Sequence, residues 1–247
     1  MRRQKQKKTK KSSYRLYIRQ IEMLAKVAKL ITSGMYLEEL LRIIVQITAE
    51  MMGSKICSLM LLDEEKKELV LRATQSVSEL YNRKPNLKLG EGIAGRVALE
   101  NKPIIVYDVK KDTRYVNQDI ARKEKLCSLA SIPLAVKGKV IGVLNCYTSQ
   151  RHKFLKNEID LLVTIANQAA IAIENAQLML RVRSAEEALV SRKIIERARD
   201  ILAEETHVLP SQAYRLIQKQ SMDSRKSMRE IAEAIILARE LKNQQQQ

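Results

Sequence analysis

The spacing of apolar residues changes along the chain from a helical period to strand-like runs and back. Residues 14–33 and the segment LEELLRIIVQITAEMMG place apolar side chains at helical intervals, and Gly34 and Gly53 are expected to end these helices. KICSLMLL and LVLRATQS are apolar runs on either side of the charged run DEEKKE. This order predicts two helices followed by a β-hairpin.

The middle of the chain predicts a second hairpin and another helical region. A short helix is expected around 92–101, with an apolar strand after Pro103. LCSLASIPLAV and KVIGVLNCYTS predict a hairpin across the sequence KGK, because glycine permits a tight turn. A long helix follows in FLKNEIDLLVTIANQAAIAIENAQLML. Residues 14–182 are therefore expected to form an α+β domain, with helices flanking an antiparallel sheet.

Two of the predicted helices carry apolar residues at heptad spacing, a pattern typical of paired helices. In the first helix these residues are Tyr17, Ile21, Leu24, Ala28 and Ile31. In the long helix they are Leu162, Ala166, Ala169, Ile173, Ala176 and Leu180. The second register then reaches Arg183 and Glu187, so a new element is expected near 184. The pattern predicts a coiled-coil-like connecting helix.

Charge is distributed unevenly along the chain, whose net charge is +17. Such a charge makes a polyanionic partner or a membrane surface worth considering. We interpret the Lys-rich residues 1–13 as a disordered basic tail. Residues 184–247 hold eleven cations and ten anions, but residues 211–229 within them hold five cations and one anion. The second basic region is therefore a local feature of a nearly neutral segment.

The cysteines and the N-terminus bear on the cellular compartment. Cys57, Cys127 and Cys146 show no metal-binding or CxxC spacing, which indicates buried thiols in a reducing compartment, and we expect a cytoplasmic protein. No apolar run reaches about 18 residues, so no membrane association through a spanning helix is expected. No apolar segment follows the basic N-terminus as it would in a signal peptide.

No catalytic or metal-binding motif stands out, so we expect a protein that is not an enzyme and holds no metal. The sequence GEGIAG contains Gly90, Gly92 and Gly95 in the G-x-G-x-x-G pattern. A dinucleotide site would also need a preceding buried parallel strand, and the polar NRKPNLKL precedes these glycines instead. We interpret them as turn residues that start a short helix.

The segment from LGEGIAGRVALENKPIIVYDV through SLASIPLAVKGKVIGVLNCYTS to the long helix closely resembles a GAF domain. The resemblance implies a sensor of a small molecule or another signal, with dimerisation through the flanking helices. No cofactor is implied, and the ligand is unknown. A pocket would lie between the sheet and residues 76–92 and 107–126, with Met60 and the three cysteines as candidate walls or simple core residues. Thiol sensing would need an exposed thiol with a lowered pKa.

The C-terminal segment, about residues 185–242, resembles an ANTAR domain, a three-helix module of RNA-binding antiterminators. The matching positions are Ala188, Leu189, Arg192, Ile194, Ile195, Ala198, Ala213, Tyr214, Leu216, Ile231 and Ala232. Asp200, His207 and the pair Leu209-Pro210 depart from the pattern, at positions where a glycine, a helix-ending glycine and a capping serine are usual. The fold expected for 184–242 is an all-α three-helix bundle, in which Ser227 and Glu230 form a capping box.

The basic region of this module supplies the candidate RNA-binding residues. Cations and helix N-termini attract phosphate, an exposed aromatic ring stacks on an unpaired base, and polar side chains bond to base edges. The candidates are Tyr214, Arg215, Gln218, Lys219, Ser221, Arg225, Lys226 and Arg229. With the resemblance, they predict a homodimeric, signal-responsive antitermination regulator that binds RNA hairpin loops in leader transcripts and prevents terminator formation.

Two other interpretations remain open from the residues alone. The terminal helices of a DNA-binding regulator would present basic, base-reading residues at the start of the last helix. The sequence EIAEAIILARE at that place is acidic and apolar, which disfavours DNA. A protein-interaction module, with the basic tail as its only nucleic-acid contact, is the second alternative.

Overall fold

The computed structural model describes residues 37–244 of the chain. The predicted basic tail and the heptad-spaced helix of residues 14–33 lie outside these residues. The chain divides into two compact units, and the boundary falls between Gln177 and Leu178, within the long helix α6 (Lys156–Thr206). Each unit is described separately.

The first unit is built on a six-stranded sheet in which every pairing is antiparallel. The strand order is β3 (Leu87–Lys88), β2 (Glu68–Thr74), β1 (Ile56–Asp63), β6 (Lys139–Tyr147), β5 (Leu129–Val136) and β4 (Ile104–Val106). Both predicted hairpins are present. The second turns at Lys137 and Gly138, whose φ angles of 50° and 83° are those of a tight two-residue turn.

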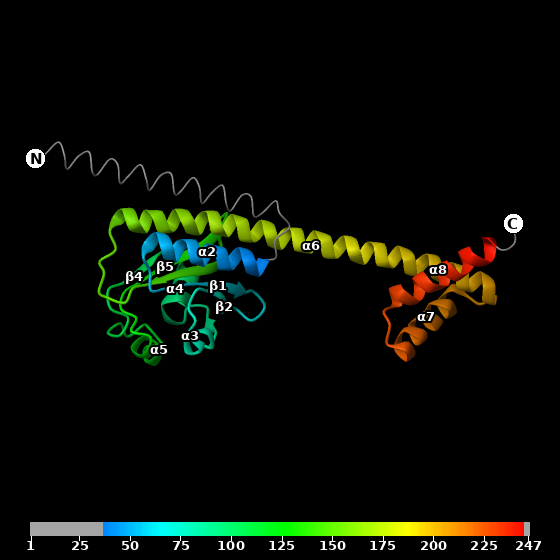
Figure 1. Cartoon of the computed structure of the whole chain (residues 1–247), viewed down its shortest axis with the longest axis horizontal. Coiled ribbons are helices and arrows are strands. Elements are labelled where there is room, and N and C mark those ends of the chain that lie inside the picture. Colours follow the sequence, from blue (N-terminus) through cyan, green and yellow to red (C-terminus); the bar gives the residue numbers. More distant parts are fainter. Residues whose placement is uncertain (1–36, 245–247) are drawn as a thin grey trace, which may run out of the picture. The chain divides into compact units, whose positions relative to one another are not determined.

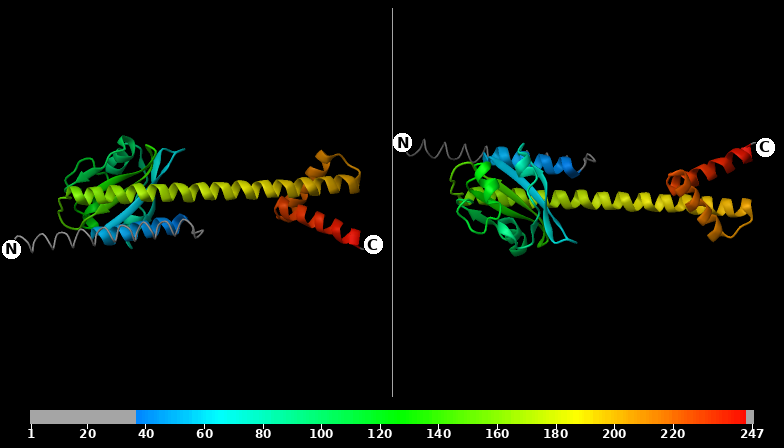
Figure 2. Two further views of the ribbon diagram at one scale, coloured as in Figure 1. Left: turned by 90° about the horizontal axis from the view of Figure 1, so that it is seen from above. Right: turned by 90° about the horizontal axis from the view of Figure 1, so that it is seen from below.

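One face of this sheet is covered by α2 (Leu37–Met52) and by the first part of α6, which lie side by side in Figures 1 and 2. Alternate strand residues, such as Leu59, Ile132 and Leu144, pack against Leu41 of α2 and Ile165 of α6 in one apolar cluster. Each wholly buried side chain of this size stabilises the fold by about 1.5–3 kcal/mol. This cluster is the main core of the unit.

The opposite face is covered by three short helices, α3 (Glu79–Asn82), α4 (Gly92–Glu100) and α5 (Gln118–Lys123). The glycines of GEGIAG lead from β3 into α4. A Cβ at Gly95 would lie 2.4 Å from the carbonyl oxygen of Lys88, so this position requires glycine for close approach. The antiparallel sheet around them excludes a dinucleotide-binding unit of the βαβ type, as the sequence predicted.

The heptad-spaced residues of α6 do not form one exposed seam. The members from Leu162 to Ile173 are buried against the sheet and α2, whereas Leu180 is 49% exposed. Their spacing therefore marks the stripe that faces the core of the first unit. The helix also continues without a break through residue 184 to Thr206, so the new element expected there is not a separate helix.

The second unit consists of the C-terminal part of α6, α7 (Pro210–Ser224) and α8 (Met228–Gln244), the three-helix arrangement predicted from the sequence. Ala198, Ala213, Ile217 and Ala232 are its fully buried apolar residues. Several partly buried residues pack around them: Ile194, Ile195, Leu202, Met228, Ile231, Ile235 and Ile236. Leu189 and Leu216, two of the positions that match the ANTAR pattern, are exposed.

Charged side chains supplement this small core. Arg239 and Lys242 of α8 contact Glu205 of α6, at 3.1 and 3.4 Å, and Arg197 contacts Glu240 at 3.1 Å. The bonds donated by Arg239 and Lys242 hold the pKa of Glu205 below its usual value. Exposed pairs of this kind contribute modestly, so the helix packing depends mainly on the apolar cluster.

Candidate nucleic-acid interface and sensor core

The turn between α7 and α8 is a compact hydrogen-bonded structure. Arg225 ends α7 in the left-handed conformation, with φ of 54°, and its backbone N–H donates to Met222 O. The N–H of Lys226 donates to Ser221 O at 3.2 Å. These two bonds define a Schellman motif, in which glycine is the usual left-handed residue. An arginine occupies that place here.

The first turn of α8 is fixed by the predicted capping box. The Glu230 carboxylate accepts from the Ser227 N–H and hydroxyl, both at 2.8 Å, while the Glu230 N–H donates to the Ser227 hydroxyl at 3.2 Å. The N–H of Ser227 is the main reason that the pKa of Glu230 lies below its usual value. The loop between α7 and α8 is therefore held at both ends.

The candidate RNA-binding residues lie along α7, in this turn and in the first turn of α8 (Figure 1). All are exposed except Ser221, which is half-buried, and Tyr214 is 44% exposed. Arg229 is paired with Glu233 at 2.8 Å. Within residues 37–244, Arg215, Lys219, Arg225 and Lys226 have no carboxylate partner within ion-pair distance.

The sensor unit contains a buried polar row on the sheet face that carries α3, α4 and α5. Ser58, Asn145 and Ser131 are directly paired across β1, β6 and β5, and each is at most 1% exposed. Ser131 donates to Asn145 Oδ1 at 2.7 Å. The Nδ2 group of Asn145 is buried without a partner among the described residues. The row separates two apolar clusters, one under α4 and one under α3 and α5.

Three tyrosines and a lysine continue this polar row. The hydroxyls of Ser58 and Tyr81 are 2.8 Å apart, and Lys84 Nζ donates to the Tyr81 hydroxyl at 3.2 Å and lies 4.4 Å from the ring centre. Tyr81 and Tyr115 both contact Tyr147 edge to face. Burial raises the pKa values of these tyrosines and lowers the pKa of the partly buried Lys84 to about 7.

The predicted ligand pocket between this sheet face and residues 76–92 and 107–126 is thus filled largely by side chains. Tyr81, Val109, Tyr115, Ile120 and Leu126 occupy the region. Sequence reasoning missed Asn145 and Lys84, because the polar row to which they belong joins residues from strands far apart along the chain.

The three cysteines are buried. Cys57 and Cys146 are directly paired across β1 and β6, on the face covered by α2 and α6, with their sulfur atoms 3.6 Å apart. Burial is the main cause of the raised pKa of the Cys57 thiol. Neither residue therefore belongs to the wall of the predicted pocket, and Cys57 lacks the lowered pKa that thiol sensing requires.

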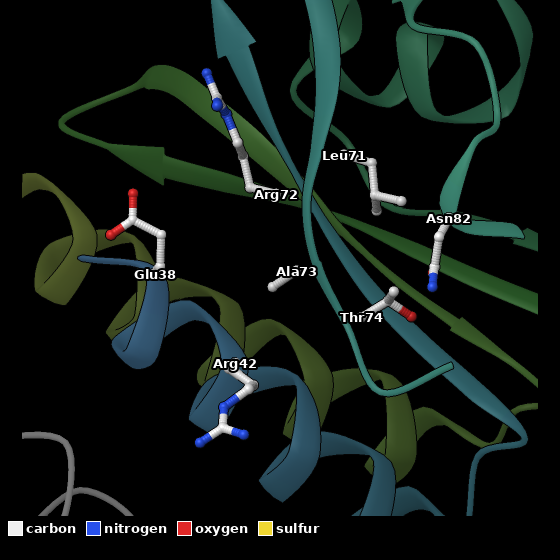
Figure 3. Close-up of a pocket in the computed structure, with 7 residues that line it drawn as sticks. All are labelled: Glu38, Arg42, Leu71, Arg72, Ala73, Thr74 and Asn82. Carbon is white, nitrogen blue, oxygen red and sulfur yellow. The ribbon is translucent and has the colours of Figure 1, made fainter. Parts of the chain in front are cut away.

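A pocket of about 420 Å³ lies instead beside the edge of β2 (Figure 3). Leu71, Arg72, Ala73 and Thr74 of β2 line it, with Glu38 and Arg42 of α2 and Asn82 of α3. Arg72 is the extra residue of a β-bulge, since Leu59 pairs with Ala73 and Met60 with Leu71. Charged side chains of both signs, Glu38, Arg42 and Arg72, are part of its lining.

A sheet-and-helix domain is followed by a three-helix module with a local basic surface, and the family matches of these two parts indicate a signal-sensing regulator. Residues 35–174 match the GAF domain family, and residues 183–236 match the ANTAR domain. The chain belongs to the GAF domain family and carries an ANTAR domain after its GAF domain, as the sequence predicted.

Known proteins resemble part of the chain. The methyl sulfide methyltransferase-associated sensor of Methanosarcina acetivorans is 32% identical over 157 residues, which is 62% of this chain and 16% of that protein. The phosphoenolpyruvate-dependent phosphotransferase system protein of Escherichia coli is 26% identical over 155 residues, 63% of this chain and 21% of that protein. The chain thus spans a small part of the length of these relatives.

Solved structures support the same fold. The GAF domain of a phosphoenolpyruvate-protein phosphotransferase from Coxiella burnetii has a TM-score of 0.58 and 26% identity, covering 66% of this chain and 96% of that structure. The corresponding Acinetobacter domain has a TM-score of 0.55 and 26% identity, covering 66% of this chain and 97% of that structure.

Among the described residues, no helix is both long and apolar enough to cross a membrane.

Proposed function

We propose that the protein is a cytoplasmic, homodimeric transcription antitermination regulator controlled by its GAF domain. In this proposal residues 14–182 form the sensor with its flanking dimerisation helices, and residues 184–242 bind RNA. A signal received by the GAF domain controls two paired ANTAR modules. These bind RNA hairpin loops in a leader transcript and prevent the terminator hairpin from forming, so that the downstream genes are transcribed.

The observation that carries this proposal is the basic surface of α7 and the α7–α8 turn within an ANTAR domain. Arg215, Lys219, Arg225 and Lys226 are exposed, and none is neutralised by a carboxylate in the region that the structure describes. Such cations bind a phosphate backbone and release its counterions. The exposed ring of Tyr214 offers a stacking surface for an unpaired loop base, worth about 1–3 kcal/mol.

Dimerisation is supported by a second stripe on α6. Ile171, Leu178, Val182 and Leu189 are each 45–57% exposed, and with Asn175 and Ala185 they follow a regular heptad pattern. Residues 181–190 are exposed on all sides of the helix. An apolar heptad stripe on an exposed helix is the surface that a coiled coil buries. We assign this stripe, and not the buried Leu162–Ile173 stripe, to the dimer.

The deciding experiment measures RNA binding by the full-length chain. A library of RNA hairpins with one fixed stem and a randomised loop is selected on the wild-type protein, and the enriched hairpin is compared with duplex DNA of the same sequence. We expect tight, salt-sensitive binding to the hairpin. Lys219→Met with Arg225→Met should lower the slope of log affinity against log salt by about 0.7 for each cation removed.

Lys110→Met with Lys111→Met removes the same charge from exposed positions in the sensor unit and serves as the matched control. It should leave the hairpin affinity nearly unchanged. Tighter binding to duplex DNA would favour a DNA-binding regulator. If removal of residues 1–13 abolished RNA binding while Lys219→Ala and Arg225→Ala left it intact, the assignment of the site to α7 and its turn would be wrong.

A further inference from the structure

We propose that Ser221 is a positioning residue that holds Arg225 and Lys226 in place for RNA, and not a residue that reads a base. This inference rests on the RNA-binding function proposed above. It assigns to Ser221 a role through the α7–α8 turn, whereas its sequence context suggested direct hydrogen bonding to a base edge.

The hydroxyl proton and the backbone carbonyl of Ser221 are already bonded within the turn. Its hydroxyl donates to Lys226 O at 2.6 Å, and its own carbonyl accepts from the Lys226 N–H at 3.2 Å. Ser221 and Lys226 therefore exchange two bonds across the end of α7. A serine hydroxyl has a single hydrogen, so in this arrangement Ser221 has no proton left to donate to a base.

The position of these two hydrogen bonds explains their effect on the two cations. Arg225 lies between the bonded residues in the left-handed conformation, which disfavours any residue other than glycine. Lys226 directly precedes Ser227, the cap of α8, so the bond to its carbonyl also fixes where α8 begins. Without the Ser221 hydroxyl, the turn keeps its backbone bonds but loses the link that restrains the Lys226 carbonyl.

The test compares Ser221→Ala, Ser221→Thr and the wild-type full chain on the hairpin selected above and on hairpins of other loop sequence. We expect Ser221→Ala to weaken binding about 3- to 10-fold, the effect of one hydrogen bond. Because phosphate contacts carry no sequence information, the loss should be similar for every loop. The salt slope should also decrease, since the cations are less well placed.

Two variants separate positioning from other roles. Ser221→Thr retains the hydroxyl and should restore affinity. Ser224→Ala is the matched control, because the Ser224 hydroxyl donates to Gln220 O within α7 and does not reach the turn; it should bind like the wild type. Circular dichroism should show the same helix content in all four proteins.

Three results would overturn the proposal. These are an unchanged affinity in Ser221→Ala, a loss confined to the preferred loop with an unchanged salt slope, and a failure of Ser221→Thr to restore binding. If the wild-type chain enriched no hairpin at all, the proposed function would fail first, and this inference would fall with it.

Discussion

His207 and Arg225 adopt the same left-handed backbone conformation at successive helix ends of the ANTAR unit, with φ angles of 53° and 54°. His207 follows α6, where the N–H of Val208 donates to Ala203 O, and Arg225 follows α7. Both positions are suited to glycine. Only Arg225 lies in the proposed RNA-binding surface. Comparing variants at the two positions therefore distinguishes an effect of backbone strain from an effect on RNA binding.

Replacing either residue by glycine should stabilise the protein. Relief of the left-handed strain is worth about 1–2 kcal/mol, and the greater freedom of glycine in the unfolded chain offsets part of it, which leaves about 0.5–1 kcal/mol. Urea unfolding monitored by circular dichroism should show this gain for both variants. Arg225→Gly alone should weaken hairpin binding. Equal RNA affinity in the two variants would remove Arg225 from the site.

The pH dependence of stability should reveal the lowered pKa of Lys84. Burial lowers its folded-state pKa to about 7, while an unfolded chain retains the ordinary value near 10.5. Between these values the unfolded state binds more protons, so the contribution of Lys84 to stability increases as the pH rises from 7 to 10. Thermal unfolding of the wild type and Lys84→Met across this range provides the measurement.

The difference in stability between the wild type and Lys84→Met isolates the contribution of Lys84. The buried Cys57 and tyrosine side chains have raised pKa values, and their contribution to stability is lost as the pH rises above about 9–10. Both proteins share that loss. The wild type should therefore gain stability relative to Lys84→Met as the pH rises. A constant difference across the range would show that Lys84 stays charged in the folded state.

The thiols should be inert in the native protein. Cys57, Cys127 and Cys146 are 0–4% exposed, and the raised pKa of Cys57 keeps that thiol protonated. Iodoacetamide at pH 8 should modify all three cysteines in urea and none at a comparable rate in buffer, as measured by mass spectrometry. Treatment with a hydroperoxide should not alter hairpin affinity. Rapid native labelling of Cys57 or Cys146 would instead favour a thiol sensor.

Local signals in the sequence predicted most of the fold. Gly53 and Gly138 adopt the positive φ angles expected of a helix end and a tight turn, and Ser227 and Glu230 form the predicted capping box. These features depend on residues close together in the chain. Apart from the half-buried Ser221, the proposed RNA-binding residues lie on exposed positions of one small module, so the sequence could also group them.

Features that depend on distant residues could not be predicted in the same way. Asn145 meets Ser58 and Ser131 only when three strands pair in one register. The heptad residues Leu162 and Ile173 satisfy the spacing of a dimer seam and of a core stripe equally well, because both bury one side of a helix. The packing of α6 on the sheet decides between them in favour of the core.

The exposed stripe of α6 makes the dimer testable with a control on the same helix. Val182→Glu places a charge among Leu178, Ala185 and Leu189, and we expect it to weaken self-association at least 10-fold in sedimentation equilibrium. Leu180→Glu introduces the same charge two residues away, on the opposite side of the helix, at a position of similar exposure. It should leave the dimer intact.

The buried stripe provides the complementary measurement. Ile173 is fully buried, so Ile173→Ala should lower the free energy of unfolding of the sensor unit by about 2–5 kcal/mol. It should not change the association of the folded chains, because Ile173 faces the sheet and α2. Dissociation by Leu180→Glu with no effect of Val182→Glu would mean that the dimer uses the opposite face of α6.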